Sequence, residues 1–167
     1  MALADQGESK PLDGGESDGR QRRTTSPAVV VGFDGSASSL DALFWASGEA
    51  RRLGGRVVAV YVSSNPAMAG LAGAVGAPST DYMVEQANNE CAERLAAEAA
   101  RCCGDGLQVQ FVHAQGTPTH ELLAVAKAVR ADLLVVGRSK KARHHLAGSL
   151  GRALAGKREA PVVVIVP

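Results

Sequence analysis

Glycine and hydroxyl residues near the end of the chain are candidates for holding a phosphate group. The apolar residues 133–136 lead into Gly137, and Gly148 and Ser149 then stand just before a new helical pattern. Glycine lets a phosphate approach the backbone, and the N–H groups of Ser149 and Leu150 at a helix start would donate hydrogen bonds to it. The same Gly-Ser pair could instead serve only to cap the helix. Spacing alone leaves both interpretations open.

Cationic and imidazole side chains gather in the loop between these two glycines. They are Arg138, Lys140, Lys141, Arg143, His144 and His145. Such a run could grip or screen a polyphosphate, although a solvated surface loop is the commoner origin of clustered charge. The adjacent histidines have no neighbouring carboxylate or cysteine, so we predict no metal ligands here.

A second polar group follows the first apolar run of the chain. Asp34, Gly35 and Ser36 come directly after the unbroken apolar residues 28–33. The Asp34 carboxylate could bind a ribose hydroxyl or a phosphate-bound Mg²⁺, or it could be an ordinary turn-forming residue before glycine. Its place after a buried strand favours a binding role. No Ser/His/Asp or Cys/His arrangement indicates nucleophilic catalysis, so we predict no catalytic residue.

Five apolar runs alternate with four helical patterns and would position these groups. The runs are residues 28–33, 56–62, 107–113, 133–136 and 161–167, and the helical patterns lie between them. This alternation predicts an α/β fold with an open, doubly wound parallel sheet. The third run alternates apolar and polar residues, which indicates a strand near an edge. Ligands of such sheets lie beyond the strand carboxyl ends, so we expect the exits of the first and fourth strands to lie side by side.

The polar segment at the start of the chain differs from the rest. Residues 1–27 have almost no large apolar side chain and cannot offset their ordering entropy, so we expect a disordered tail before one folded domain over residues 28–167. Residues 63–80, rich in Gly, Ala and Pro, are expected to form a long connection.

Charge and composition exclude some classes of partner. The net charge is +1, which gives no global attraction to nucleic acid or to an anionic membrane. No stretch has the apolar length of a signal peptide or a membrane span, so we expect a cytoplasmic protein. Cys91, Cys102 and Cys103 lack metal-binding spacing and are expected to be reduced and buried in one helix.

Several short motifs, taken in order, resemble the universal stress protein family. They are VVVGFDGS over residues 29–36, AVYV over 59–62, the Gly116-x-Pro118 turn, ADLLVVG over 131–137, Gly148-Ser149, and APVVVIV over 160–166. The resemblance covers nearly all of residues 28–167, and the ordered combination is far more specific than any single motif.

The resemblance implies a Rossmann-like sheet with the strand order 3-2-1-4-5 and a cytoplasmic homodimer. The charge-free last strand, Val162–Val166, would lie at a sheet edge and could be covered by its copy in a second chain. The family also implies binding of an adenine nucleotide, ATP first with Mg²⁺ as a companion, and AMP or cyclic AMP as alternatives. Because no positioned base is evident, any hydrolysis should be slow. The alternative is a dimeric interaction module of the same fold that binds no nucleotide.

The family's nucleotide contacts can be carried over to matching positions. Asp34 would approach ribose, phosphate or metal, Val62 would offer backbone groups to adenine, and the last glycine loop would hold phosphates and ribose. Lys140 stands where the family motif G-x2-G-x9-G has its second glycine, and the loop from there to Gly148 is two residues shorter. The predicted binding residues are Asp34, Gly35, Ser36, Val62, Gly137, Arg138, Lys140, Gly148, Ser149 and Leu150.

Overall fold

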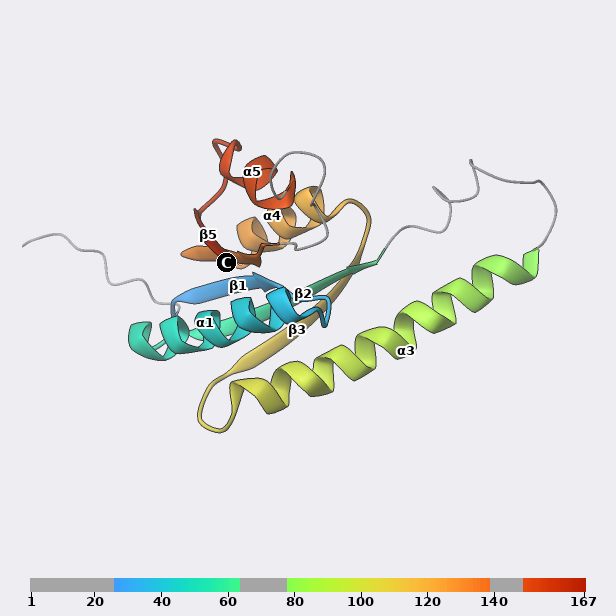
Figure 1. Cartoon of the computed structure of the whole chain (residues 1–167), viewed down its shortest axis with the longest axis horizontal. Coiled ribbons are helices and arrows are strands. Elements are labelled where there is room, and N and C mark those ends of the chain that lie inside the picture. The colour runs from blue at the N-terminus through green and yellow to red at the C-terminus, as the bar shows by residue number, and fades with distance from the viewer. Residues whose placement is uncertain (1–25, 64–77, 139–148) are drawn as a thin grey trace, which may run out of the picture.

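A computed structural model describes residues 26–63, 78–138 and 149–167 and contains one five-stranded parallel sheet (Figure 1). The strand order β3-β2-β1-β4-β5 confirms the predicted fold class and order. The strands are β1 (Ala28–Gly32), β2 (Arg56–Ser63), β3 (Val109–Gln115), β4 (Leu133–Gly137) and β5 (Val162–Val166). The predicted tail and most of the 63–80 connection lie outside the described residues, as does the loop between β4 and the last helix.

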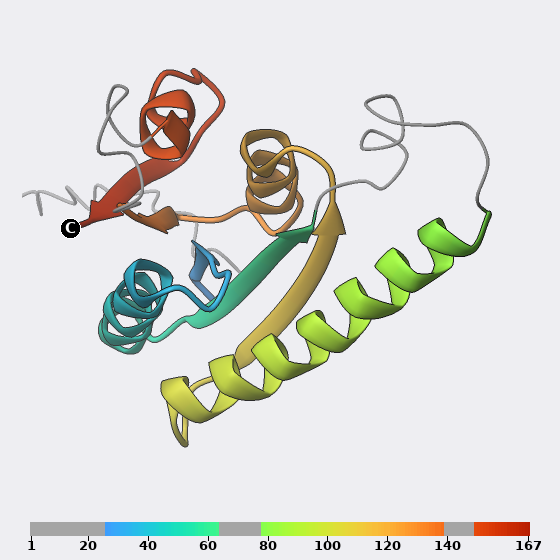
Figure 2. The ribbon, with the colours of Figure 1, turned by 45° about the vertical axis from the view of Figure 1, so that its right-hand side comes forward.

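Helices cover both faces of the sheet, as Figure 2 shows. They are α1 (Ala37–Leu53), α3 (Pro78–Cys103), α4 (Pro118–Ala128) and α5 (Ser149–Ala155). Side chains of alternate strand residues point to opposite faces, so Val29 and Val31 pack towards α1 and α3 while Val30 packs towards α4 and α5. Burial on both faces explains why the β1 sequence is uniformly apolar.

Both ends of α1 carry residue types that commonly cap helices. Ser36 is the N-cap, and its side chain accepts a hydrogen bond from the Ser39 N–H at 3.3 Å. Gly54 ends the helix in the left-handed conformation, with φ of 63°. The helical spacing of Leu40, Leu43, Phe44 and Ser47 in the sequence predicts a buried Phe44, but this side chain is 55% exposed. The helix packs through its small residues Ala42, Ala46 and Ala50, which let its backbone approach the sheet and turn Phe44 outwards.

Helix α3 packs on the sheet only over its C-terminal half. Helical spacing in the sequence predicts one buried stripe that includes Val84, Ala87, Leu95 and Ala99. Leu95 and Ala99 are buried, but Val84 and Ala87 are exposed. The reason is that α3 extends past the ends of β2 and β3, where no described element faces it (Figures 1 and 2).

The three cysteines are free thiols. Cys103 is buried and lies 3.1 Å from the Ser47 hydroxyl, and burial raises the pKa of its thiol. Cys91 and Cys102 are half-buried. All three lie in α3 as expected, but the expected burial holds only for Cys103. Among the described helices, none has both the length and the apolar character needed to cross a bilayer.

Candidate functional site

The exits of β1 and β4 lie in contact at the carboxyl edge of the sheet. The two strands are direct neighbours, with Val31 opposite Val135. A Cβ atom built on Gly137 would lie only 2.1 Å from the carbonyl oxygen of Ser38 in the first turn of α1. The structure therefore brings together the two chain reversals that the sequence predicted would be adjacent.

This contact gives Gly137 a structural role of its own. Its φ is not in the left-handed region, so the requirement for glycine comes from space and not from backbone conformation. The space that a side chain would fill is occupied by Ser38 backbone and Cβ atoms. The glycine is thus needed for α1 to begin beside β4, whether or not a ligand approaches the same backbone.

Asp34 is held by the start of α1. Its Oδ1 accepts a hydrogen bond from the Ser36 N–H at 3.0 Å, and its own N–H donates to Ser39 Oγ at 3.3 Å. Burial acts to raise the pKa of the Asp34 carboxyl, but hydrogen bonds from Ser36 and Ser39 outweigh it, and the net shift is downwards. The carboxylate is consequently ionised at neutral pH and fixed in orientation, and Asp34 remains exposed.

Gly35 is fixed between Asp34 and α3. Its φ is +77°, a conformation that side chains disfavour, and an added Cβ would lie 2.8 Å from Leu95 Cδ2. Helix α3 therefore supports the β1 exit from the side, and this loop cannot shift towards α3 without displacing Leu95.

Other predicted binding residues frame the same edge. Val62 is half-buried near the end of β2 and, like Leu150 in α5, packs against the α4-side core. The Arg138 N–H donates to the Val166 carbonyl at 2.8 Å, and the residue is exposed. Ser149 begins α5, but its side chain is outside the described part, as are Lys140 and Gly148.

A polar group at the ends of β2 and β3 was missed by the sequence analysis. The rings of Tyr61 and His113 stack with centroids 5.3 Å apart, and a His113 Nε2 to Ser63 Oγ hydrogen bond measures 2.9 Å. Burial, and then a hydrogen bond with the Cys91 thiol, raise the pKa of the Tyr61 phenol. The alternation of residues 107–113 did place His113 on one face with Phe111, but only the β2–β3 register pairs it with Tyr61.

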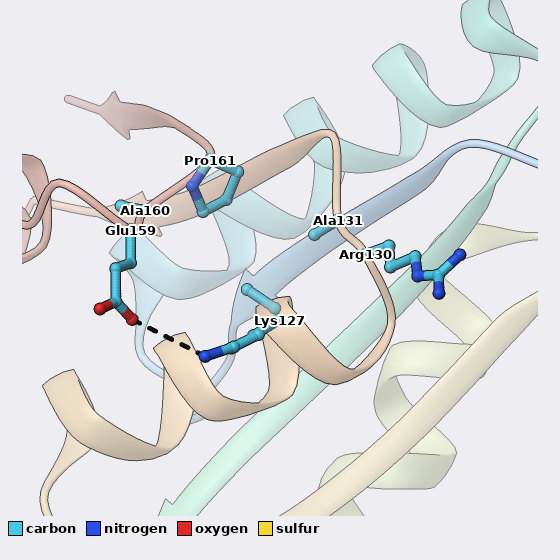
Figure 3. A pocket seen from close by; sticks show the side chains of 7 residues that line it. Lys127, Arg130, Ala131, Glu159, Ala160 and Pro161 are labelled. Carbon is cyan, nitrogen blue, oxygen red and sulfur yellow. Dashed lines mark ion pairs between the residues drawn. The ribbon is translucent and has the colours of Figure 1, made fainter.

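A cavity among the described residues lies at the opposite edge of the sheet. It measures about 290 Å³ and is shown in Figure 3; its lining residues are Ala126, Lys127, Arg130, Ala131, Glu159, Ala160 and Pro161. These residues stand at the end of α4 and before β4 and β5, so the cavity is separate from the strand exits. No group of three His, Cys, Asp or Glu side chains suited to a metal ion occurs in the described ranges.

Comparison with known proteins links this fold to one family. The model of the universal stress protein family matches residues 27–166. A universal stress protein family structure from Burkholderia pseudomallei is 23% identical, with 87% of this chain and 98% of that chain covered and a TM-score of 0.65. No curated protein sequence matches the chain.

Two further solved structures carry nucleotides. A universal stress protein in complex with cyclic AMP is 24% identical, with 86% of this chain and 98% of that chain covered and a TM-score of 0.59. A family protein from Arabidopsis thaliana with AMP bound is 19% identical, with 84% and 92% covered and a TM-score of 0.59. At these identities the similarity establishes a shared fold.

Proposed function

Because this chain belongs to the universal stress protein family, we propose that it binds an adenine nucleotide, ATP foremost, beyond the carboxyl ends of β1 and β4. The observation that carries the proposal is the contact between the two strand exits, where Gly137 meets the first turn of α1 beside the oriented Asp34 carboxylate. Solved family structures with cyclic AMP and with AMP support an adenine nucleotide as the ligand class.

The residues at this edge suit the parts of a nucleotide. Of the two Asp34 carboxylate oxygens, Oδ1 accepts the hydrogen bond from the Ser36 N–H. We propose that Oδ2 binds a ribose hydroxyl or the Mg²⁺ that neutralises phosphate charge. Direct contact between this carboxylate and phosphate would be repulsive, so the phosphates belong nearer Arg138, Lys140 and the Gly148–Ser149–Leu150 backbone. Val62, with Gly35 and Ser36, would border the adenosine.

We propose binding with little or no hydrolysis. A general base works best when its pKa lies near the working pH. The Asp34 carboxyl has a lowered pKa and already accepts the Ser36 N–H, so it is a weak base for activating water. The role that remains is that of a nucleotide-controlled stress-response or signalling protein.

Titration calorimetry with ATP plus Mg²⁺, AMP and cyclic AMP tests this function. We expect saturable heat with one nucleotide per chain, and stabilisation of about 2.7 kcal/mol at a ligand concentration a hundred times Kd. Absence of both heat and thermal shift at millimolar concentrations of all three nucleotides would sink the nucleotide proposal. The protein would then be the alternative, a dimeric interaction module, and the short loop carrying Lys140 would be the sequence feature that explains the loss.

We also propose a cytoplasmic homodimer formed through β5. This strand pairs with β4 on one side, and no other described strand covers its second side. Val162 is 66% and Ile165 is 46% exposed, which makes β5 an apolar edge that pairing with a second copy would cover.

The variant Val162→Lys/Ile165→Lys should raise the dimer dissociation constant about tenfold or more. Pairing of the two β5 strands would remove part of the solvent around each lysine ammonium group, and this loss of hydration opposes association. Sedimentation equilibrium gives the dissociation constant. The matched control is Tyr82→Lys/Met83→Lys, which changes two exposed apolar residues on α3. Equal weakening by both variants would argue against β5 as the interface.

A further inference from the structure

The cavity at the amino edge of the sheet combines an apolar floor with a cationic rim. Ala126, Ala131, Ala160 and Pro161 are its apolar lining residues, and Lys127 and Arg130 add positive charge at the end of α4. Figure 3 shows the Arg130 side chain extending away from Glu159. Lys157 and Arg158, both exposed, directly precede the lining residue Glu159 in the turn before β5.

One acidic residue faces these cations without neutralising them. Glu159 Oε2 lies 3.9 Å from Lys127 Nζ, and Figure 3 shows the two side chains pointing towards each other. Their side chains are 84% and 80% exposed, so water screens the pair and it contributes little. Two cations, Lys127 and Arg130, line the cavity with this carboxylate. Lys157 and Arg158 precede Glu159 in the chain, and the nearby Asp132 carboxylate is engaged by the Ala28 N–H. We infer a modest local excess of positive charge that suits an acidic segment.

The polypeptide enters the fold beside this cavity. The Ala28 N–H donates to Asp132 Oδ2 at 3.0 Å, and the Asp132 N–H donates to the Ala28 carbonyl at 2.9 Å. Asp132 directly follows Ala131, a lining residue. The 25 residues that precede the described chain therefore start next to the cavity.

One stretch of that preceding segment has the complementary charge, whereas Arg20, Arg22 and Arg23 lie between this stretch and the described chain. Residues 12–18 read Leu-Asp-Gly-Gly-Glu-Ser-Asp, with three carboxylates, one large apolar side chain and no cation. Seven residues lie between Asp18 and Ser26, and an extended chain over these eight residue steps reaches about 26 Å. Two strand spacings, from β1 across β4 to β5, amount to only about 10 Å.

We propose that residues 12–18 of the same chain dock on this cavity, with Leu12 over the alanine and proline floor and the carboxylates of Asp13, Glu16 and Asp18 against the cationic rim. Covalent linkage supplies an effective concentration in the millimolar range, so a weak, salt-sensitive contact suffices. The site lies at the opposite edge from the proposed nucleotide site and does not depend on it.

Zero-length carbodiimide cross-linking of the full chain tests this docking, because it joins carboxylates only to lysines in direct contact. An equal mixture of ¹⁴N- and ¹⁵N-labelled protein separates links within a chain from links between chains. We expect same-chain links from residues 13–18 to Lys127 or Lys157 that fall at least about fivefold in 0.5 M NaCl. The Lys127–Glu159 pair, already in contact, is the internal positive control.

Two double variants distinguish docking from random encounter. Arg130→Gln/Arg158→Gln keeps both lysines and should lower the link yield about threefold, whereas Arg52→Gln/Arg101→Gln, at the ends of α1 and α3, should leave it unchanged. Equal effects of the two variants, links mainly to Lys140 or Lys141, links mainly between chains, or no tail link while Lys127–Glu159 forms would each overturn the proposal.

Discussion

Replacing Gly137 with alanine is expected to destabilise the fold by about 3 kcal/mol, the upper part of the usual range for overpacking. The new methyl group would lie 2.1 Å from the Ser38 carbonyl oxygen and 2.4 Å from its carbonyl carbon. Backbone atoms cannot rotate away as a flexible side chain can, so α1 or β4 must shift. Thermal unfolding should show a Tm lower by about 10 °C for a domain of this size.

The other glycines of the fold supply matched controls. Gly48 lies in α1 with nothing within 4 Å of its added Cβ, so Gly48→Ala should stabilise the protein by about 0.5–1 kcal/mol through helix propensity. A Cβ on Gly55 would lie 2.3 Å from the Pro27 carbonyl oxygen at the opposite edge of the sheet. Gly55→Ala should thus destabilise as Gly137→Ala does, while only Gly137→Ala should also weaken nucleotide binding by the folded protein. A Gly137→Ala variant with unchanged Tm would contradict the close approach of α1 to β4.

The sheet and its ligand edge were predictable because their signals are local. Unbroken valine runs at residues 29–31 and 162–164 indicate strands, and Ser36 and Gly54 mark the ends of α1. Once the strands are parallel and β1 neighbours β4, the place of Asp34 beside the β4 exit follows from topology.

Features that depend on tertiary packing were not predictable. Ala42 and Ala46 let α1 approach the sheet closely, and this close approach decides which side of the helix is buried. The periodicity of the sequence does not show it, so the prediction that Phe44 is buried was wrong. The helical periodicity of apolar residues continues along α3 beyond the end of the sheet. Val84 therefore fits the pattern of a buried residue although no described element covers it. The Tyr61–His113 stack needs the register of two strands whose paired residues are 52 positions apart, and no local motif encodes that register.

Converting Asp34 to asparagine is expected to weaken binding of Mg²⁺-ATP roughly 10- to 100-fold, the loss that follows from removing a charged hydrogen-bonding partner worth about 1.5–3 kcal/mol. Asparagine keeps an acceptor oxygen for the Ser36 N–H and suits the same kind of turn, so the α1 N-terminus should stay folded. Calorimetric titration gives the affinity, and an unchanged far-UV circular dichroism spectrum verifies the fold. The control is Asp41→Asn, which changes an exposed aspartate about one turn after the start of α1. This variant should bind nucleotide as the wild type does.

The ligand dependence of this loss would identify the partner of the carboxylate. If Asp34 binds Mg²⁺, the variant should lose affinity for Mg²⁺-ATP but bind AMP without metal almost normally. If it accepts a hydrogen bond from a ribose hydroxyl, ATP and AMP should weaken by similar factors. Cyclic AMP, whose 3′ oxygen is esterified, would then be affected less unless the 2′ hydroxyl is the partner. Wild-type affinity of Asp34→Asn for all three nucleotides would mean that Asp34 serves only to form the turn into α1, as its hydrogen bond to Ser36 alone would suggest.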